Sequence, residues 1–411
     1  MLDSVVERTD KFISGRPKAE RKAFGQFFTS IETARFMAGL FDYPRKPVIK
    51  ILDPGAGSGI LSATVIDELN RRPETIKKIE LTCYETNGDI LPLLESNIEL
   101  MKLYSTIPLS VKIVTENYIT TQGNDFSENL LAAKNPLKYD VIIANPPYFK
   151  LSKDAPEALS MQNICYGAPN IYFLFAAMSL FNLKEGGEMV YIIPRSWTSG
   201  AYFARFRDYL LKEGKLTAIH VFSSRSKVFG KEDVLQETMI IKVRKTQITP
   251  EHVKITSSED SVDFEHITEL YAPYHLVVSG TERFVYLVTS QEEIEVMEKV
   301  HSFAHPLPEI GLKMKTGLTV DFRNRQLLRN TSGEHAVPLF YAQHLKNGRV
   351  VFPIGKENEY ITDELPGMVQ LNRNYLFVKR FTSKEEQRRL QCAVYLADHY
   401  PEYQKISTQN K

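Results

Sequence analysis

The chain has 411 residues, of which 43% are hydrophobic and 25% are charged, and its formal net charge is +1. This composition is that of an ordinary globular protein, and the length allows two or three domains. No apolar run approaches the roughly 20 residues that span a bilayer, and the first residues lack the apolar core of a signal peptide, so we expect a cytoplasmic protein without a membrane partner. Because the net charge is so small, an anionic partner must be bound by a local basic patch.

The cysteines are too few and too scattered to define a site. Cys83, Cys165 and Cys392 lie far apart and form no C-x-x-C pair. This spacing indicates neither a zinc site nor a disulfide framework. We therefore expect three structural thiols and no bound metal.

Short β-rich runs alternate with helical patterns from about residue 48 to residue 243, as in a doubly wound parallel sheet. The runs predict seven strands, at 48–54, 79–85, 110–118, 139–147, 186–197, 215–222 and 237–243. Helices are predicted between them at 60–72, 89–104, 170–183 and 201–214. Ligands of such a sheet bind at the carboxyl ends of its strands, so the active site is expected there.

The pattern changes after Lys245. Beyond it the sequence predicts two strands and a helix, at 252–258, 274–280 and 290–302, and then a mixed region rich in Arg, Lys, Asn and Tyr. We expect four parts: an N-terminal arm at 1–24, a catalytic domain at 25–245, a linker and sheet extension at 246–300, and a separate domain at 301–411.

The first predicted strand opens into LDPGAGSG, with glycines at 55, 57 and 59. Glycine between a strand and a helix lets the backbone approach a ligand closely. A dinucleotide fingerprint would have its third glycine where this chain has Ile60, so a nucleoside without a pyrophosphate fits better. The next strand ends on Glu85, whose carboxylate could accept hydrogen bonds from both hydroxyls of a ribose. The alternative is a plain tight turn and a solvated acid.

The strand at 139–147 ends in a stiff corner, Asn145-Pro146-Pro147-Tyr148. Proline fixes its own φ and restricts the residue before it, so the Asn145 side-chain oxygen and the Pro146 carbonyl become fixed acceptors. Two acceptors suit an amino group, and the flat ring of Tyr148 suits stacking on a planar base. Amides and prolines are poor metal ligands. The alternative is a proline-terminated strand with a turn asparagine.

These motifs together resemble the amino-group DNA methyltransferases with an NPPY motif, in particular the gamma class typified by the TaqI enzyme. The resemblance rests on GQFFTS at 25–30, the glycine turn and the NPPY corner in that order, and it covers about 23–243. It implies a Rossmann-like, seven-stranded S-adenosylmethionine-dependent methyltransferase sheet of the α/β class. Segments within 301–411 are similar to recognition domains of PstI/BsuBI-type modification enzymes, which implies a mixed α+β target-recognition domain.

The resemblance also assigns roles to single residues. It implies that S-adenosylmethionine is bound by Thr29, Asp53, Gly55, Gly57, Glu85, Asn117 and Tyr118. Asn117 stands where the family usually has an aspartate, so an amide oxygen would bond the amino group of the cofactor's adenine. The implied catalytic residues are Asn145, Pro146 and Tyr148, and Phe229 would pack on the target base opposite Tyr148. The alternative for Phe229 is a core phenylalanine.

The implied activity is methyl transfer from S-adenosylmethionine to the N6 amino group of a flipped adenine in double-stranded DNA, within a restriction-modification system. Basic residues beyond position 312 suit phosphate clamping and base readout: Lys313, Lys315, Arg323, Arg325, Arg329, Arg349, Arg373, Lys379, Arg380, Arg388 and Arg389. The alternative for each of them is an ordinary solvated surface side chain. We expect a monomer, with a separate cognate restriction endonuclease as a candidate partner.

Two other functions stay open at this point. An NPPY methyltransferase could hold an amino group of RNA or of a protein glutamine with the same two acceptors, although the GQFFTS motif and the long C-terminal part argue against it. A catalytically silent DNA-binding module is the other alternative. Against it stand the intact glycine turn, Glu85 and the NPPY corner.

Overall fold

The structure is a computed structural model of the chain. It describes residues 1–15, 17, 28–72, 75–128, 138–222, 237–260, 264–382 and 386–410. The chain divides into two compact units, Met1–Ser302 and Phe303–Lys411. Within the described residues, no helix has the length and apolar character needed to cross a membrane.

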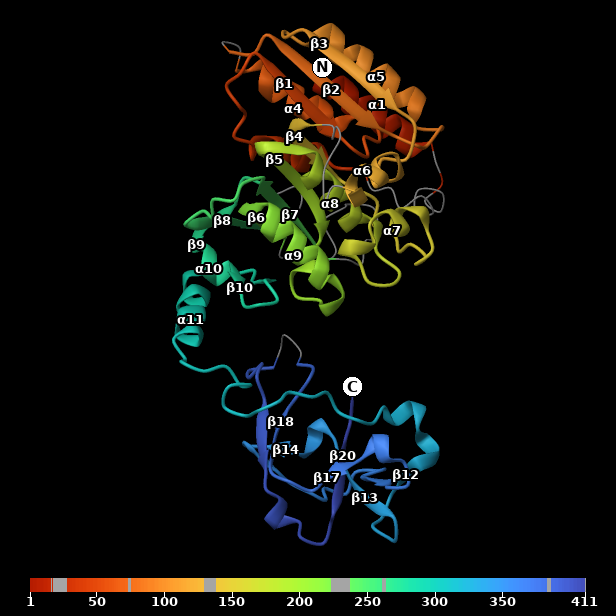
Figure 1. Cartoon of the computed structure of the whole chain (residues 1–411), viewed down its shortest axis with the longest axis vertical. Helices are drawn as coiled ribbons and strands as arrows, with labels where there is room; N and C mark the ends of the chain where they lie inside the picture. The colour runs from red at the N-terminus through yellow and green to blue at the C-terminus, as the bar shows by residue number, and fades with distance from the viewer. Residues whose placement is uncertain are drawn as a thin grey trace. The chain divides into compact units, whose positions relative to one another are not determined.

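The first unit is built on a nine-stranded sheet of order β3-β2-β1-β4-β5-β7-β6-β8-β9 (Figure 1). Its strands are β1 (Val48–Asp53), β2 (Lys78–Tyr84), β3 (Leu109–Val114), β4 (Tyr139–Ala144), β5 (Leu183–Pro194), β6 (Lys215–Phe222), β7 (Thr238–Arg244), β8 (His252–Ser258) and β9 (Thr268–Pro273). β1 to β5 are parallel, and β7 is antiparallel to both β5 and β6. The seven predicted strands and the Rossmann-like α/β sheet are confirmed, and β8 and β9 extend the sheet beyond the predicted seven.

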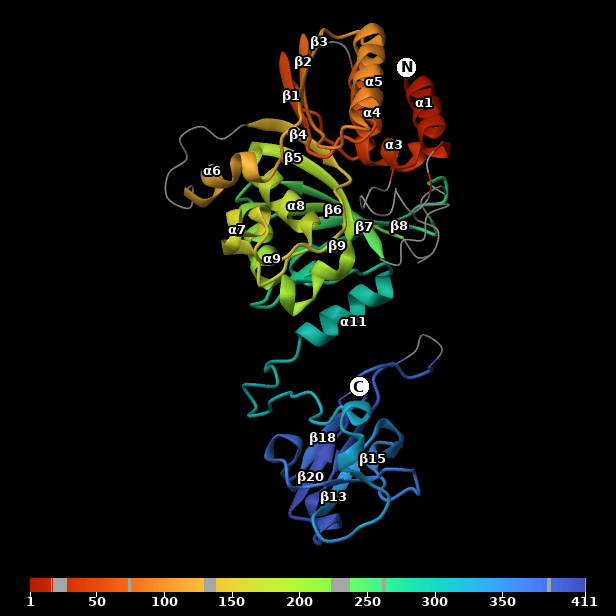
Figure 2. The same cartoon turned by 90° about the vertical axis from the view of Figure 1, so that its right-hand side faces the viewer.

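Helices cover both faces of this sheet (Figure 2). One face carries α1 (Leu2–Ser14), α3 (Ile31–Gly39), α4 (Ile60–Asn70) and α5 (Leu91–Tyr104). The other carries α6 (Gly123–Glu128), α7 (Pro156–Ser160), α8 (Ile171–Asn182) and α9 (Ala204–Glu213). Each face has its own hydrophobic core, because a parallel strand such as β4 is buried on both sides. The four helices predicted between strands are confirmed.

The beginning of the chain contributes to this core. Residues 2–14, expected within a polar arm, form α1, which packs on α4 and α5. Its Leu2 and Val5 are buried. The apolar face of α1 therefore covers the helix layer on one side of the sheet.

The segment after β7 extends the sheet. β8 pairs with β6, β9 pairs with β8, and α11 (Gln291–His301) follows. The strand predicted at 274–280 is wrong: α10 (Tyr274–Val277) is a single helical turn, and only β10 (Val278–Ser279) pairs, with β11 (Phe284–Val285). Tyr274, Leu276 and Val277 are all buried, a spacing that one helical turn provides and a strand with alternating faces does not.

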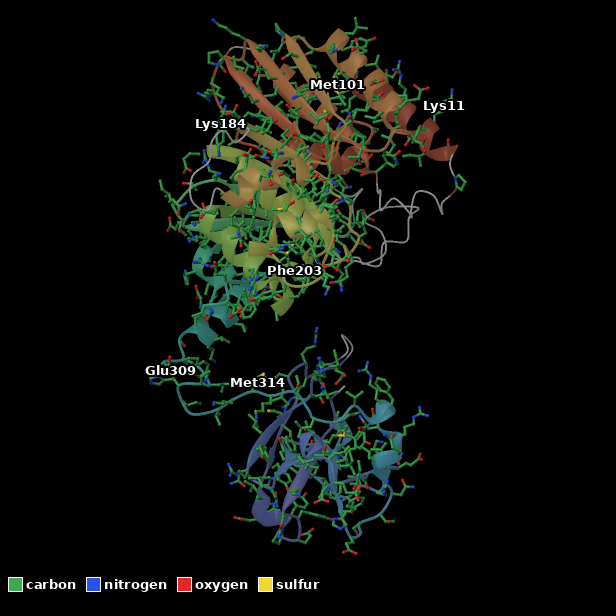
Figure 3. The ribbon with its side chains drawn as sticks, turned by 45° about the vertical axis from the view of Figure 1, so that its right-hand side comes forward. Lys11, Met101, Lys184, Phe203, Glu309 and Met314 are labelled. Carbon is green, nitrogen blue, oxygen red and sulfur yellow. The ribbon has the colours of Figure 1, made fainter. Side chains whose placement is uncertain are left out.

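The second unit contains two small sheets around an aromatic core. The five-stranded sheet has the order β12 (Leu328–Arg329), β16 (Tyr360–Thr362), β13 (Ala336–Phe340), β20 (Lys405–Thr408) and β17 (Gln370–Leu371). The four-stranded sheet has the order β14 (Leu345–Lys346), β15 (Arg349–Val350), β19 (Cys392–Tyr395) and β18 (Tyr375–Val378). Phe340, Phe352 and Tyr395 lie in the core. Glu309 and Met314 lie on the irregular segment that precedes these strands (Figure 3).

Candidate active site

A cavity of about 560 Å³ lies at the carboxyl ends of β1 to β4, where the sequence predicts the site, and its volume suits a small-molecule ligand. Many of the residues expected to bind a cofactor or a target line it: Gly55, Gly57, Glu85, Asn117, Tyr118 and Asn145. Phe28, Phe149, Glu157 and Phe175 also line it, and none of them was among the predicted site residues. The topology of the sheet therefore gathers residues that are up to 147 positions apart in the lining, from Phe28 to Phe175.

The glycine turn and Glu85 are joined by hydrogen bonds. The backbone N–H of Gly57 donates to Glu85 Oε2 at 2.9 Å, and that of Asn87 donates to Oε1 at 2.8 Å. Gly57 has φ +53°, in the left-handed region that glycine adopts without a steric penalty. Each carboxylate oxygen keeps a further lone pair. Glu85 can therefore accept hydrogen bonds from two hydroxyls of a ligand in the cavity.

Asp53 lies behind this turn and is not among the described residues that line the cavity. It is fully buried, and Ser62 Oγ donates to its Oδ2 at 2.8 Å. Burial raises the pKa of Asp53 to about 7, although the bond from Ser62 opposes the shift. The contact between Asp53 and a cofactor stays a prediction.

Asn145 is held from two directions. Its Nδ2 donates to Thr29 Oγ1 at 3.1 Å, and its Oδ1 accepts a hydrogen bond from the Tyr148 hydroxyl at 2.6 Å. The same hydroxyl lies 2.8 Å from the carbonyl oxygen of Ile192 in β5. These contacts restrain the amide group, and an amide oxygen is a hydrogen-bond acceptor of the kind that suits an amino group. Thr29 thus lies beside the NPPY corner, but it is not among the described residues that line the cavity, so its contact with the cofactor stays a prediction.

Tyr148 is almost fully enclosed. It is 8% exposed, and its ring meets that of Tyr172 edge-on, with 6.3 Å between centroids. Tyr172 in turn contacts Phe203, which Figure 3 labels. Burial raises the pKa of Tyr148 well above its usual range, so the hydroxyl keeps its proton. Stacking of Tyr148 on a base stays a prediction.

Two further sequence predictions concern Pro146 and Phe229, neither of which is among the described residues that line the cavity. Of the described corner residues, Asn145, Pro147 and Phe149 line the cavity, whereas Pro146 and Tyr148 do not. Phe229, predicted to pack on the target base, lies outside the described residues. The roles of Pro146 and Phe229 therefore stay predictions as well.

Asn117 has an arrangement that the sequence did not predict. Its Oδ1 accepts hydrogen bonds from the backbone N–H groups of Ile119 at 2.9 Å and Thr120 at 3.1 Å, and so caps the turn after β3. Its Nδ2 donates to Glu157 Oε1 at 2.8 Å. Both lone pairs of the Asn117 amide oxygen are therefore in use, which argues against the expected bond from this oxygen to the cofactor's adenine.

Glu157 lies on an excursion of the chain between β4 and α8. Backbone pairing closes this excursion at its base: Lys150 forms a bridge with Asn170, and Ile171 N–H donates to the carbonyl of Phe149 at 3.0 Å. Glu157 follows Pro156 in the first turn of α7, a common start for a helix, and this was its one sequence signal. The closed base fixes where the excursion starts and ends beside the cavity.

The wall beside Asn117 and Glu157 is apolar and aromatic. Tyr118, Ile171 and Phe175 line it, and the rings of Tyr118 and Phe175 have centroids 5.4 Å apart. Such surfaces suit a planar base. Of the described residues that line the cavity, only Glu85 and Glu157 are charged, and both are acidic. Among the described residues, no group of three or more His, Cys, Asp or Glu side chains gathers as a metal site.

A solved structure with partial similarity is the methyltransferase subunit of a type I restriction-modification system from Streptococcus thermophilus. The similarity has a TM-score of 0.43 and 17% identity, and it covers 68% of this chain and 54% of that one.

Comparison with protein families and curated proteins gives stronger matches. Residues 68–229 match the family model described as Eco57I restriction-modification methylase. The chain is 33% identical over 401 residues to the type II methyltransferase M.BsuBI of Bacillus subtilis, covering 96% of this chain and 79% of that protein. It is 32% identical over 418 residues to the type II methyltransferase M.PstI of Providencia stuartii, covering 99% and 79%. The chain therefore belongs to the family of type II restriction-modification methyltransferases that includes M.BsuBI and M.PstI.

Proposed function

We propose that this methyltransferase transfers a methyl group from S-adenosylmethionine to the N6 amino group of an adenine in double-stranded DNA. The observation that carries the proposal is the position of Asn145, whose amide is fixed by Thr29 and Tyr148 at a cavity that also contains Glu85. Membership of the family shows that the protein is a methyltransferase of the restriction-modification type. The cofactor and the adenine target are the parts that we propose.

The cavity residues fit S-adenosylmethionine. Glu85 offers two acceptors for the ribose hydroxyls, and Tyr118 and Phe175 offer aromatic surface for the adenine. The two charged side chains in the described lining are acidic, which favours a ligand that carries positive charge, as a sulfonium and an ammonium group do. Nothing in the described lining offers a cationic side chain to a phosphate.

The NPPY corner would activate the exocyclic nitrogen of adenine, which is otherwise a poor nucleophile. The exocyclic nitrogen of adenine shares its lone pair with the ring, and Asn145 Oδ1 and the Pro146 carbonyl would accept its two N–H bonds. These acceptors favour a tetrahedral nitrogen and stabilise the positive charge that develops on it. When bound, S-adenosylmethionine would supply an electrophilic methyl group to that nitrogen, with S-adenosylhomocysteine as the leaving product. The described residues at the corner include no strong base, so the proton would leave to water.

The target atom lies inside the duplex, so the adenine must be flipped out, at a cost of roughly a few kcal/mol. We propose that Tyr148 and Phe229 return part of this cost by packing on the extruded base. Basic residues of the second unit would hold the phosphates. Lys379 is paired with Glu386 and Arg380 is bonded to Asn410, whereas Arg349 and Arg373 have no acidic partner in the described residues. We expect the two last-named side chains to contribute more to DNA binding.

A methylation assay tests the proposal. The purified protein is incubated with S-adenosylmethionine labelled on its methyl group and with duplex DNA, ribosomal RNA and protein in parallel. We expect label in duplex DNA as N6-methyladenine, and none with Asn145→Ala. Label on cytosine would overturn the adenine target, and label in RNA or in protein glutamine alone would overturn the DNA substrate. A protein that labels none of the three substrates, and that binds no S-adenosylhomocysteine in a separate calorimetric titration, would be the silent DNA-binding module.

We further propose that the enzyme acts as a monomer beside a separate restriction endonuclease. Because its proposed substrate is genomic DNA, the cytoplasm is the compartment in which we propose that it works.

A further inference from the structure

We propose that Glu157, and not Asn117, recognises the exocyclic amino group of the cofactor's adenine and makes the site selective for adenosine. This inference rests on the proposed function, because it assumes that S-adenosylmethionine binds in the cavity described above. It deepens that function by naming a specificity-determining residue.

The hydrogen bonds of Asn117 remove it from direct recognition. Its amide oxygen accepts from two backbone N–H groups of the turn that follows β3, those of Ile119 and Thr120. Its amide nitrogen donates to Glu157 Oε1 at 2.8 Å. An amide oxygen has two lone pairs, so a ligand amino group would have to displace a backbone donor to reach it. Asn117 is therefore a positioning residue that holds the Glu157 carboxylate.

Glu157 has the acceptor capacity that Asn117 lacks. Only Oε1 is bonded in the described residues, which leaves Oε2 and the second lone pair of Oε1 for a ligand. The side chain lines the cavity and is only partly exposed. Its neighbour Ala158 is 2% exposed and anchors α7, and α7 contacts α6 and α8. The carboxylate is thus presented from a packed helix turn.

The surroundings of Glu157 suit a base more than a sugar. Asn117, which holds it, follows β3, whereas Glu85 follows β2, the neighbouring parallel strand. The lining also contains the rings of Tyr118, which follows Asn117 in the chain, and Phe175, whose centroid lies 5.4 Å from that of Tyr118. A ligand that satisfies both carboxylates needs hydrogen-bond donors at two separate places with a flat apolar part near the second. The diol and the amino group of adenosine meet this requirement.

A carboxylate accepts hydrogen bonds and donates none, so Glu157 would discriminate by the group at position 6 of the purine. Adenine has an amino group there and bonds the carboxylate. Hypoxanthine has a carbonyl oxygen, which the carboxylate repels. A site that hydrogen-bonds one group of a ligand loses much more affinity for the analogue without that group than it would for the loss of a methyl group. The reason is that the polar group of the site is left without a partner.

Isothermal calorimetry tests the inference with two product analogues, S-adenosylhomocysteine and S-inosylhomocysteine. The wild-type protein should bind the adenosyl compound at least tenfold more tightly. Glu157→Ala should lose about tenfold or more of the affinity for the adenosyl compound, and should lose the preference over the inosyl compound, as expected for a hydrogen bond to a charged group. Glu157→Gln keeps the size of the side chain and can donate to a carbonyl, so it should gain affinity for the inosyl compound.

Two further variants make the test specific. Glu116→Ala removes an exposed acid next to Asn117 that is not in the described cavity lining, and it should bind both compounds as the wild type does. Asn117→Asp in the Glu157→Ala background places a carboxylate on the strand end, where one oxygen can cap the turn and the other can face the ligand. This double variant should regain part of the preference for the adenosyl compound.

The failure of this inference and that of the proposed function have different signatures. Equal losses for both compounds in Glu157→Ala, or an unchanged preference, would overturn the role of Glu157 and leave the cofactor proposal standing. A wild-type protein that binds neither compound would overturn the cofactor proposal, and this inference with it. If Glu157→Ala does not fold by circular dichroism, the near-isosteric Glu157→Gln decides, because an unchanged preference there is equally contradictory.

Discussion

The hydroxyl of Tyr148 lies 2.6 Å from Asn145 Oδ1 and 2.8 Å from the carbonyl oxygen of Ile192. A tyrosine hydroxyl has one proton, and a carbonyl can only accept a hydrogen bond, so two acceptors share one donor. The strand β5 therefore limits how the hydroxyl can turn, and the hydroxyl limits how the Asn145 amide can turn. The tyrosine of the NPPY corner has a positioning role that its ring alone would not give.

Removal of this hydroxyl should slow methyl transfer without weakening cofactor binding. Tyr148→Phe keeps the ring and loses the bond to Asn145, and a hydrogen bond of about 1 kcal/mol corresponds to roughly a fivefold lower single-turnover rate. Calorimetry with S-adenosylhomocysteine should show an unchanged affinity. A rate equal to that of the wild type would show that the hydroxyl does not orient Asn145.

Removal of the ring should have a second effect that depends on the DNA. Tyr148→Ala should react more slowly still, and part of the loss should return on a duplex in which the target adenine is mispaired, because the flipping cost is then lower. The measurement is single-turnover methylation of matched and mispaired duplexes at one fixed salt concentration. Equal losses on both duplexes would mean that Tyr148 does not support base flipping.

Asn145→Ala should reduce transfer more than a hundredfold and leave the affinity for S-adenosylhomocysteine within a few-fold. The amide oxygen is assigned to the target amino group, so its loss removes stabilisation of the transition state rather than of the cofactor complex. Asn145→Asp keeps an acceptor facing Tyr148 and should retain more activity than the alanine variant. Near-normal turnover of Asn145→Ala would contradict the assignment.

The affinity for S-adenosylhomocysteine should fall as the pH is lowered. Burial raises the pKa of Glu85, while hydrogen bonds from Asn87 and Gly57 oppose this shift. As the pH falls through the raised pKa, the carboxylate gains a proton and loses acceptor capacity for the ribose hydroxyls. Glu85→Gln should bind more weakly at neutral pH and lose this part of the pH dependence. An affinity that is unchanged by the substitution would contradict the ribose assignment.

Asp53 should lower the stability of the fold at and above neutral pH. Its folded pKa of about 7 lies above the ordinary value because burial penalises the charge. The unfolded chain loses this proton at lower pH than the folded chain, so ionisation favours unfolding increasingly between about pH 4 and pH 7 and then levels off. The melting temperature of Asp53→Asn, relative to the wild type, should rise across this window. A constant difference between pH 5 and pH 8 would contradict the shift.

The sequence predicted the elements that are marked by a pattern of neighbouring residues. Val141, Ile142 and Ile143 mark a strand buried on both faces, and the prolines after them mark its end, so β4 and the corner follow from local rules. The same holds for the glycine turn and for Glu85 at the end of β2. Each depends on residues that are neighbours in the chain.

Contacts between distant segments could not be predicted in this way. The bond from Tyr148 to Ile192 joins residues 44 positions apart, and that from Asn117 to Glu157 joins residues 40 positions apart. Only the packed sheet brings these pairs together. Residues 274–277 show a limit of local rules, because so short a run, with three apolar or aromatic residues and the exposed His275, fits a strand and a helical turn equally well.

The backbone bridge between Lys150 and Asn170 closes a stretch of chain that connects the NPPY corner with Glu157. The chain leaves the corner that holds Asn145, runs out to Glu157 and returns to the bridge, so one closed stretch of backbone joins the target side of the cavity to the proposed adenine contact. A ligand bound to Glu157 would therefore restrain a stretch of chain whose base includes Phe149, another residue of the cavity lining. Cofactor binding and placement of the target base would then both order the same stretch of chain. Whichever occurs first would lower the entropic cost of the other, so we expect the two binding steps to be positively coupled.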